Sequence, residues 1–334
     1  MTDPGLEAKV RFLSRAKSYP EPTTLVQGVQ THLSWVFLTD QHAWKLKKPY
    51  RWNHHDLATV EARHEHCLME QRLNERLSDG VYLGVVPLTA DTRGQLAFGP
   101  GGNAVDWLVK MRRLPAERML DHLISEHMLV PEELRAVVRT LADFYRQGPP
   151  AAVSPADFRA RFEIGIEDNR SALALPEFGL QAAAEVCDRS RAFLAREARA
   201  LEQRAIDRRI VEGHGDLRPE HICLEAKPQV IDCLEFSREL RLMDAAEELA
   251  FLALECERLG APKLRATIFE AYAQASGDKP PDALLHFYQS YHACVRAKIA
   301  IWHLRDPALG SYPRWAAQAR GYLLLAERHI DRCA

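Results

Sequence analysis

The sequence predicts an α+β protein of two lobes, a small antiparallel sheet followed by a larger, mainly helical part. Up to residue 112, short runs rich in β-branched and aromatic residues alternate with turn signals, and one long helical pattern interrupts them. From residue 113 onward, apolar residues recur at helical spacing. We therefore assign residues 1–112 to the first lobe and 113–334 to the second, as two parts of one unit.

Turn residues delimit the elements expected in the first lobe. A short helix over residues 5–18 ends before a proline-rich stretch, and a long helix over 57–77 has Asp56 as its expected N-cap and Gly80 in its stop signal. Strand signals occupy residues 25–29, 35–38, 43–47, 81–88 and 105–111, with a weaker one at 95–98.

The second lobe is expected to be helical around a small β island. Helical periodicity covers residues 117–128, 132–146, 156–170, 180–205, 243–259, 262–276, 281–304 and 312–332. The island comprises residues 210–211, 222–224 and 230–234, and a turn at Ala226-Lys227-Pro228 makes the last two segments a candidate hairpin.

Composition excludes several classes of protein. The 334 residues are 47% hydrophobic and carry a net charge of -2, so the chain is not disordered as a whole, and the charge balance argues against a nucleic-acid binder. The N-terminus does not resemble a signal peptide, and no apolar run is long enough to span a membrane. Seven widely spaced cysteines indicate reduced, buried thiols. We expect a cytoplasmic protein, and the sequence does not indicate its oligomeric state.

One stretch carries the clearest chemistry. Asp216 lies in a run that reads Gly-His-Gly-Asp, and Asp232 follows sixteen residues later, after the candidate hairpin. Because a hairpin brings its two ends together, the two carboxylates can converge. Phosphoryl transfer uses such a pair: one carboxylate accepts the proton of the acceptor hydroxyl, and the other holds Mg²⁺ against the nucleotide phosphates. Asp216 is the candidate base and Asp232 the candidate metal ligand.

At these residues the chain resembles the aminoglycoside-phosphotransferase and protein-kinase-like superfamily, whose catalytic loop has the form H-x-D-x-x-x-x-N. The resemblance implies the bilobal protein-kinase-like fold, with His214 bracing the loop and Asp244 a structural residue that also braces it. Runs such as residues 31–38, 82–87 and 290–298 are similar to an uncharacterised bacterial subgroup, some of whose members carry a fused P-loop ATPase domain. No P-loop motif occurs here, so we expect that domain to be absent.

The chain departs from the family pattern at His221, which stands where the family has a metal-binding Asn. An imidazole suits Mg²⁺ poorly. Three alternatives stay open: His221 binds the metal differently, Glu220 or Glu235 substitutes for it, or the protein is a nucleotide-binding pseudokinase with a regulatory or scaffold role. Transfer of AMP on the same fold is a further alternative.

The resemblance also assigns nucleotide-binding residues in the first lobe. It implies a strand lysine that holds phosphates and a helix glutamate that orients it. Lys45 and Lys47 lie two residues apart and so share one face of a strand; Lys45 fits the family form better. Glu70 is the expected partner, with rivals at positions 61 and 65. Thr31 and Ser34, in the loop expected over the phosphates, could donate hydrogen bonds to them.

The function expected from these residues is ATP- and Mg²⁺-dependent transfer of a phosphoryl group to a hydroxyl of a small molecule. The acceptor itself is not named by the sequence. Arg296 and Lys298 lie in a late helix of the kind that lines acceptor pockets in the superfamily, with His292 one turn earlier. A cluster of basic side chains there would suit an anionic acceptor. The alternative is that these residues form ordinary salt bridges on the helix surface.

Overall fold

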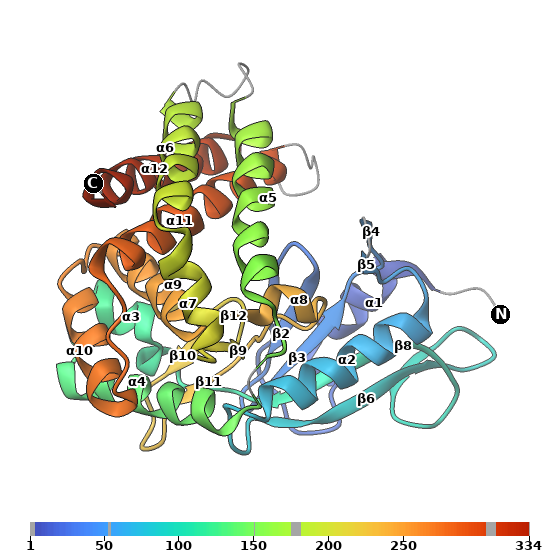
Figure 1. Ribbon diagram of the computed structural model, residues 1–334. Helices are drawn as coiled ribbons and strands as arrows, with labels where there is room; N and C mark the ends of the chain where they lie inside the picture. Colours follow the sequence, from blue (N-terminus) through green and yellow to red (C-terminus); the bar gives the residue numbers. More distant parts are fainter. Residues whose placement is uncertain (1–3, 53–54, 150, 175–181, 305–311, 334) are drawn as a thin grey trace. The chain divides into compact units, whose positions relative to one another are not determined.

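A computed structural model describes residues 4–52, 55–149, 151–174, 182–304 and 312–333 (Figure 1). The chain divides into two compact units. Unit 1 comprises Met1–Arg118 together with a segment that returns from the second half of the chain, Glu225–Ser237. Unit 2 comprises Met119–Leu224 and Arg238–Ala334. Each unit contains its own hydrophobic core, and they are described separately below.

Unit 1 is built on a six-stranded antiparallel sheet, which confirms the sheet expected from the sequence. Its strand order is β1-β2-β3-β8-β6-β7. The strands are β1 (Gln27–Gln30), β2 (Ser34–Leu38), β3 (His42–Lys47), β6 (Tyr82–Ala90), β7 (Leu96–Phe98) and β8 (Asn103–Arg112). The register pairs Val36 of β2 with Lys45, and Lys45 with Val109 of β8, so β3 is an interior strand.

Alternation along β3 separates the two faces of the sheet. Trp44 and Leu46 are buried in the core beneath α1 (Gly5–Leu13) and η1 (Ala16–Ser18). Ala43 belongs to the core on the opposite face, together with Cys67 of α2 (Val60–Asn74). Because side chains of a strand alternate between faces, the lysines at 45 and 47 point to the α2 side.

Helix α2 is shorter than the sequence predicted. Its N-cap is Thr59, whose hydroxyl accepts a hydrogen bond from the Ala62 N–H at 3.1 Å. The predicted cap, Asp56, instead ends a short strand pair, β4 (Arg51–Trp52) with β5 (His55–Asp56), and forms an ion pair with Arg51 at 2.9 Å. Thr and Asp compete as caps because both offer an acceptor oxygen, and the strand pair decides between them.

A buried ion network joins three elements of unit 1. Asp106 of β8 is inaccessible to solvent and accepts hydrogen bonds from Lys9 of α1 at 2.8 Å and from Arg63 of α2 at 2.7 and 3.0 Å. Arg63 also donates to the Leu57 carbonyl at 2.9 Å. Nearly every polar atom of the network is therefore paired, which is the condition under which buried charge is tolerated.

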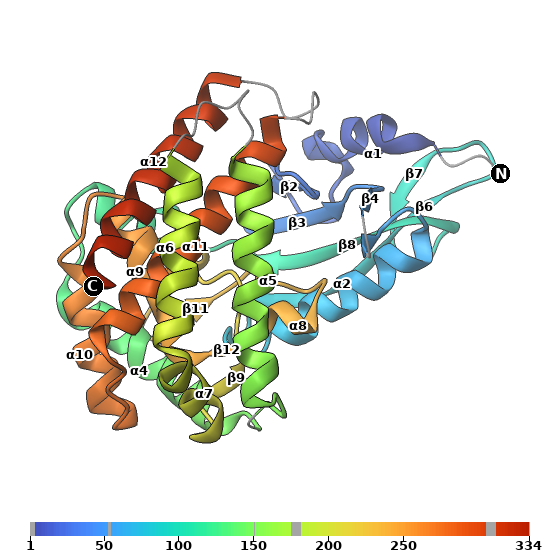
Figure 2. The same cartoon turned by 45° about the horizontal axis from the view of Figure 1, so that its top comes forward.

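Unit 2 is mainly helical, as expected. Its helices are α3 (Leu120–Ser125), α4 (Pro131–Gln147), α5 (Pro155–Leu173), α6 (Ala182–Arg196), α7 (Ala198–Ile206), α8 (Arg238–Arg241), α9 (Ala245–Arg258), α10 (Leu264–Ser276), α11 (Asp282–Leu304) and α12 (Tyr312–Ile330). Helices α5, α6 and α11 pack side by side, and α12 packs along α11 (Figure 2). Their shared core includes Phe162, Phe193, Phe287 and Tyr322.

Several elements of the second half differ from prediction. The helix expected over 180–205 divides at Glu197 into α6 and α7, and its first two residues lie outside the described residues. Strand β9 (Ile210–Glu212) pairs with an unpredicted strand, β12 (Leu242–Asp244). The candidate hairpin strands form as β10 (Ile222–Cys223) and β11 (Gln229–Val230). The latter stops early because Asp232 has a φ of 61°, which an extended strand does not adopt.

All seven cysteines are buried, and none of them forms a disulfide in the structure. In the part of the chain that the structure describes, no helix is long and apolar enough to cross a membrane.

Candidate active site

Two lysines and three carboxylates of unit 1 form one cluster, which we call the lysine–carboxylate cluster: Lys45, Lys47, Glu70, Asp232 and Glu235. Glu70, from α2, is inaccessible to solvent and accepts from Lys45 at 2.8 Å and from Lys47 at 2.6 Å, through different oxygens. The alternation of β3 places both lysines on the α2 side, so one glutamate reaches both. The rival glutamates at 61 and 65 are exposed.

The returning segment supplies the other two carboxylates. Asp232 accepts from Lys45 at 2.6 Å, and Glu235 accepts from Lys47 at 2.6 Å. The backbone holds Asp232 in the left-handed region at φ 61°, where its N–H donates to the Tyr82 hydroxyl at 3.2 Å. A non-glycine residue in this region is uncommon and concentrates at functional sites. The segment therefore presents Asp232 at a fixed turn rather than along a strand.

The two lysines differ in accessibility. The side chain of Lys47 is 1% exposed and that of Lys45 12%, while Asp232 is 43% exposed. Burial lowers the pKa of Lys45, but Asp232 and Glu70 outweigh it and raise that pKa well above its ordinary value. Burial likewise opposes the ionised form of Glu235, yet Lys47 and Lys45 keep its pKa below its ordinary value. Lys45 and Glu235 are therefore charged at neutral pH.

The second group of candidate residues lies in residues 213–221 of unit 2, here called the catalytic loop. Asp216 accepts from Arg218 Nε at 3.2 Å, and its N–H donates to His214 Nδ1 at 3.3 Å. His214 is inaccessible to solvent, a position that suits the bracing role expected for it. Burial tends to raise the pKa of Asp216, but Arg218, His221 and Arg296 hold it below its ordinary value. The candidate base is therefore ionised at neutral pH.

A residue that the sequence analysis missed holds the catalytic loop. Glu248 of α9 is inaccessible to solvent; one of its oxygens accepts from the backbone N–H groups of His214 at 2.8 Å and Gly215 at 2.7 Å. The other oxygen accepts from the Tyr145 hydroxyl at 2.6 Å. Gly213 has no room for a side chain here, because an added Cβ would lie 2.7 Å from this carboxylate. The sequence signal that could have identified it is the pair of acidic residues inside an otherwise apolar helix.

Asp244 is structural but does not contact the catalytic loop, which corrects its expected bracing role. It caps α9 by accepting from the Ala246 N–H at 2.9 Å, and it pairs with Arg204 at 2.6 and 2.8 Å. Arg204 also binds Asp278 at 2.6 and 2.7 Å. Glu248, one helical turn after Asp244, contacts the loop instead.

His221 uses both ring nitrogens within the catalytic loop. Its Nδ1 lies 2.9 Å from the Asp216 carbonyl oxygen, and its Nε2 lies 2.9 Å from Arg218 Nη2. The consistent assignment has Nδ1–H donating to the carbonyl and Nε2 accepting from the arginine. To bind a metal, His221 would have to release Arg218. Its metal role stays a prediction.

Thr31 and Ser34 close the turn between β1 and β2. The Thr31 hydroxyl accepts from the Ser34 N–H and donates to the Ser34 carbonyl oxygen, both at 3.0 Å. Their expected contact with phosphates also stays a prediction.

The basic residues of α11 separate in the structure. The Nη1 atom of Arg296 lies 4.0 Å from the Asp216 carboxylate. Lys298 is buried on a different face of the helix, and its ammonium group lies over the Trp302 ring. His292 pairs with Glu247 of α9 at 3.0 Å. Of the three residues that the sequence grouped, only Arg296 lies beside the candidate base.

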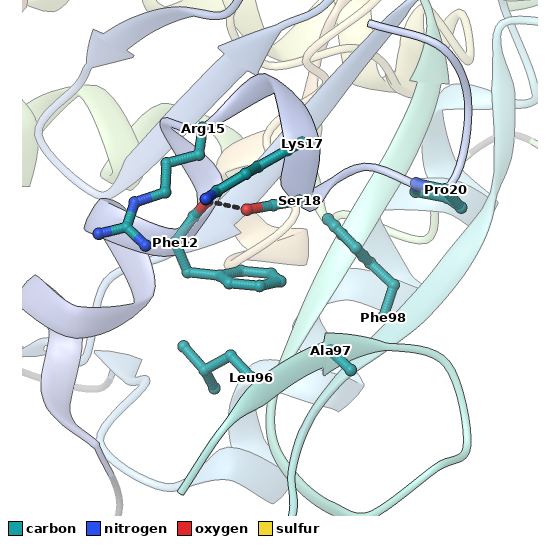
Figure 3. A pocket seen from close by; sticks show the side chains of 8 residues that line it. All are labelled: Phe12, Arg15, Lys17, Ser18, Pro20, Leu96, Ala97 and Phe98. Carbon is teal, nitrogen blue, oxygen red and sulfur yellow. Dashed lines mark hydrogen bonds between the residues drawn. The ribbon is translucent and has the colours of Figure 1, made fainter.

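A hollow of about 420 Å³ in unit 1 lies away from these residues. Phe12, Leu96 and Phe98 form its apolar floor, and Arg15 and Lys17 stand at its rim (Figure 3). It contains none of the predicted site residues.

Comparison with known proteins agrees with the geometry. The model of the phosphotransferase enzyme family matches residues 84–285, more than half of the chain. Uncharacterised proteins of Mycobacterium tuberculosis and Mycobacterium bovis are 31% identical over 311 residues. The match covers 90% of this chain and 59% of each relative, so the chain spans about three fifths of their length.

Solved structures match over nearly the whole chain. A choline/ethanolamine kinase family protein from Mesorhizobium loti gives a TM-score of 0.56 at 15% identity, covering 97% of this chain and 94% of that one. The choline kinase LicA from Streptococcus pneumoniae gives 0.57 at 13% identity, covering 98% and 99%. At this identity the likeness concerns the fold, and it confirms the bilobal protein-kinase-like fold that the sequence predicts.

Proposed function

Because this chain belongs to the phosphotransferase enzyme family, we propose that it transfers the γ-phosphoryl group of ATP to a hydroxyl of a small molecule, with Mg²⁺. The observation that carries this proposal is the lysine–carboxylate cluster, in which Lys45 binds both Glu70 and Asp232. An oriented lysine beside a metal-binding carboxylate is the arrangement that holds a nucleoside triphosphate in such enzymes. Another solved structure with a similar fold is that of LicA in complex with AMP.

Asp216 acts as the general base in this proposal. Its carboxylate accepts the proton of the acceptor hydroxyl while that oxygen attacks the γ-phosphorus, and the bond from phosphorus to the β,γ-bridging oxygen breaks, which leaves ADP. Lys45 binds phosphate oxygens, and Glu70 orients it. Lys47 is fully buried between Glu70 and Glu235, so it supports the cluster rather than contacting the nucleotide.

The donor atoms of the cluster fit Mg²⁺. Asp232 offers an accessible carboxylate, and Glu235 a second one nearby in sequence; both are hard oxygen donors. Within the described ranges no three His, Cys, Asp or Glu side chains form a metal site by themselves. Mg²⁺ is commonly bound by one or two carboxylates together with substrate phosphates, so Asp232 would hold it and Glu235 would assist. The ion would neutralise charge on the transferring phosphoryl group.

Two substitutions test the proposal against a panel of hydroxyl compounds. Asp216→Asn should lower kcat by about 10²–10⁴-fold and leave ATP affinity unchanged. Asp232→Ala should remove the Mg²⁺ dependence of ATP affinity, as measured by calorimetry with and without Mg²⁺. An Asp216→Asn protein that no longer binds ATP would show that the base is misassigned.

A nucleotide-binding protein without transfer is the second candidate, and the hydrogen bonds of His221 favour it. With both ring nitrogens engaged, this residue offers no lone pair in the position of the family's metal-binding Asn. ATP bound with Mg²⁺ and no turnover with any acceptor would support that candidate. Transfer of an isotopic label to the acceptor from the α-phosphate of ATP, rather than from the γ-phosphate, would indicate AMP transfer instead.

A further inference from the structure

We propose that Arg296 selects acceptors that carry an anionic group, a carboxylate or a phosphate monoester, beside the hydroxyl to be phosphorylated. This inference rests on the proposed function and names its substrate class. It follows from the charges around Asp216 in unit 2.

Arg296 lies where an acceptor must bind. Its Nη1 is 4.0 Å from the Asp216 carboxylate, and the general base has to contact the acceptor hydroxyl. The side chain is 16% exposed, so part of it is open to solvent. The guanidinium is steadied over the ring of Tyr322, at 5.7 Å from the centroid.

The neighbouring carboxylates are already paired with other groups. Glu255 accepts from Arg258 at 2.7 Å and from the Tyr322 hydroxyl at 2.7 Å. Arg258 also pairs with Glu220 at 2.5 Å. Asp216 has its own arginine, since Arg218 donates to it at 3.2 Å.

In the described part of the chain, Arg296 is therefore the arginine of this group that makes no hydrogen bond to a carboxylate. Its nearest carboxylate oxygens, on Glu255 and Asp216, are 3.7 and 4.0 Å away, beyond hydrogen-bond distance. Among the described residues it makes one hydrogen bond, from Nε to the Tyr322 hydroxyl at 3.4 Å. Within the ranges that the structure describes, no hydrogen bond uses the N–H groups on the two terminal nitrogens of this guanidinium, so these groups can donate to a bound molecule. A planar pair of such donors matches carboxylate or phosphate oxygens and repels an ammonium group.

The test compares acceptors that share one sugar framework and differ in charge: glucose, glucosamine, glucuronate and glucose 6-phosphate, with a glycerol, glycerate and glycerol phosphate series beside them. ADP formation and product mass are measured for the wild type and for Arg296→Gln and Arg296→Lys. Lys298→Gln, on the same helix and away from Asp216, is the matched control. A second readout, the shift in unfolding temperature with each compound, does not depend on turnover.

We expect a higher kcat/KM for the anionic compounds than for the neutral or cationic ones. Arg296→Gln should lower it about 10- to 100-fold for the anionic compounds only, the range of one charged hydrogen bond. Arg296→Lys should retain part of the preference, and Lys298→Gln all of it. The carboxylate and phosphate members distinguish which anion is bound.

The outcomes separate the two proposals. Preference for glucosamine, or an unchanged preference in Arg296→Gln, would overturn the inference and leave the phosphotransferase standing. If no compound is phosphorylated but the anionic ones stabilise the wild type and not Arg296→Gln, Arg296 binds the anionic group as inferred, and it is the proposed phosphoryl transfer to these compounds that fails. If no compound is phosphorylated and none stabilises the wild type, the inference is overturned.

Discussion

At the scale of single residues, the two lysines of β3 show how accessibility separates roles that the sequence leaves equivalent. Both bind Glu70, but Lys45 is the more exposed and also binds Asp232, whereas Lys47 is sealed against Glu235. In the proposed function, the nucleotide phosphates therefore contact Lys45, the more exposed of the two. The buried lysine neutralises carboxylates that are costly to leave unpaired.

Substituting each lysine by Met should therefore give opposite results. Lys45→Met should weaken ATP binding by at least tenfold with a modest change in stability. Lys47→Met should lower the free energy of unfolding by about 3–5 kcal/mol, because it leaves buried carboxylates without their cation. Calorimetry with ATP and urea unfolding distinguish the two, and Lys17→Met, at an exposed lysine, is the control. Equal loss of affinity in both variants would contradict the assignment.

A pH profile tests the environment of Asp216. Burial raises its pKa, but Arg218, His221 and Arg296 more than compensate and keep it below its ordinary value. The ionised form, which is the active one in the proposed mechanism, therefore persists to low pH. Arg218→Gln should raise the pKa of Asp216 and move the acidic limb of kcat/KM to higher pH. If the acidic limb of kcat/KM stays at the same pH in an Arg218→Gln protein that folds, then the ionisation of Asp216 does not determine that limb.

At the scale of elements, α9 contacts the catalytic loop through Glu248 and through Arg258, which pairs with Glu220. Glu248 accepts both loop N–H groups and the Tyr145 hydroxyl, while its neighbour Glu247 turns to Arg161 and His292. The adjacent glutamates are equally buried and differ in what they hold.

The pair offers a matched experiment. Glu248→Gln should lower kcat at least tenfold while ATP affinity is kept, because the amide cannot replace the carboxylate as acceptor of two backbone donors and a hydroxyl. Glu247→Gln should lower the unfolding temperature and leave kcat close to the wild type. Stopped turnover in both variants, with equal stability loss, would mean that Glu248 acts only through the fold.

Elements with strong local signals were predictable, and those set by distant partners were not. The alternation Ala43-Trp44-Lys45 gave β3 its faces, and periodicity gave most helices of unit 2. No local signal marks the break between α6 and α7. Strand β12 was not predicted because its three residues form a strand only by pairing with β9. The cap of α2 was misplaced because the pairing of Asp56 with Arg51 cannot be read from propensity.

At the scale of the whole molecule, a buried histidine pair couples unit 2 to pH. His286 and His329 join α11 to α12 through their Nδ1 atoms at 2.8 Å, and His329 pairs with Glu257 of α9 at 3.0 Å. Burial, with help from Arg265, lowers the pKa of His286 from 6.5 to about 4. The unfolded chain therefore binds a proton at His286 that the folded chain does not bind.

Stability should consequently fall as the pH drops from about 6.5 to about 4. His286→Gln should flatten that part of the curve of unfolding free energy against pH, since it removes the group whose protonation differs between the states. Urea titrations at several pH values measure it. An unchanged slope in the variant would contradict the low pKa.

The candidate site was predictable as a list of residues and less so as an arrangement. Asp216, Lys45 and Glu70 follow from motif and strand pattern. The contribution of residues 225–237 to unit 1, which brings Asp232 and Glu235 to the lysines, depends on long-range contacts that local sequence does not encode. Glu248 and Arg296 are likewise brought to the catalytic loop by the packing of α9 and α11.

Because every cysteine is buried, the number of thiols that react with an alkylating reagent reports which part of the protein has unfolded. Two thiols, Cys67 and Cys233, belong to unit 1, and five, at 187, 223, 256, 294 and 333, belong to unit 2. A thiol shielded in a core reacts with an alkylating reagent only when that core opens. A pulse of iodoacetamide at rising urea should thus add two labels or five before the full seven, and the mass of the first species tells which unit yields first.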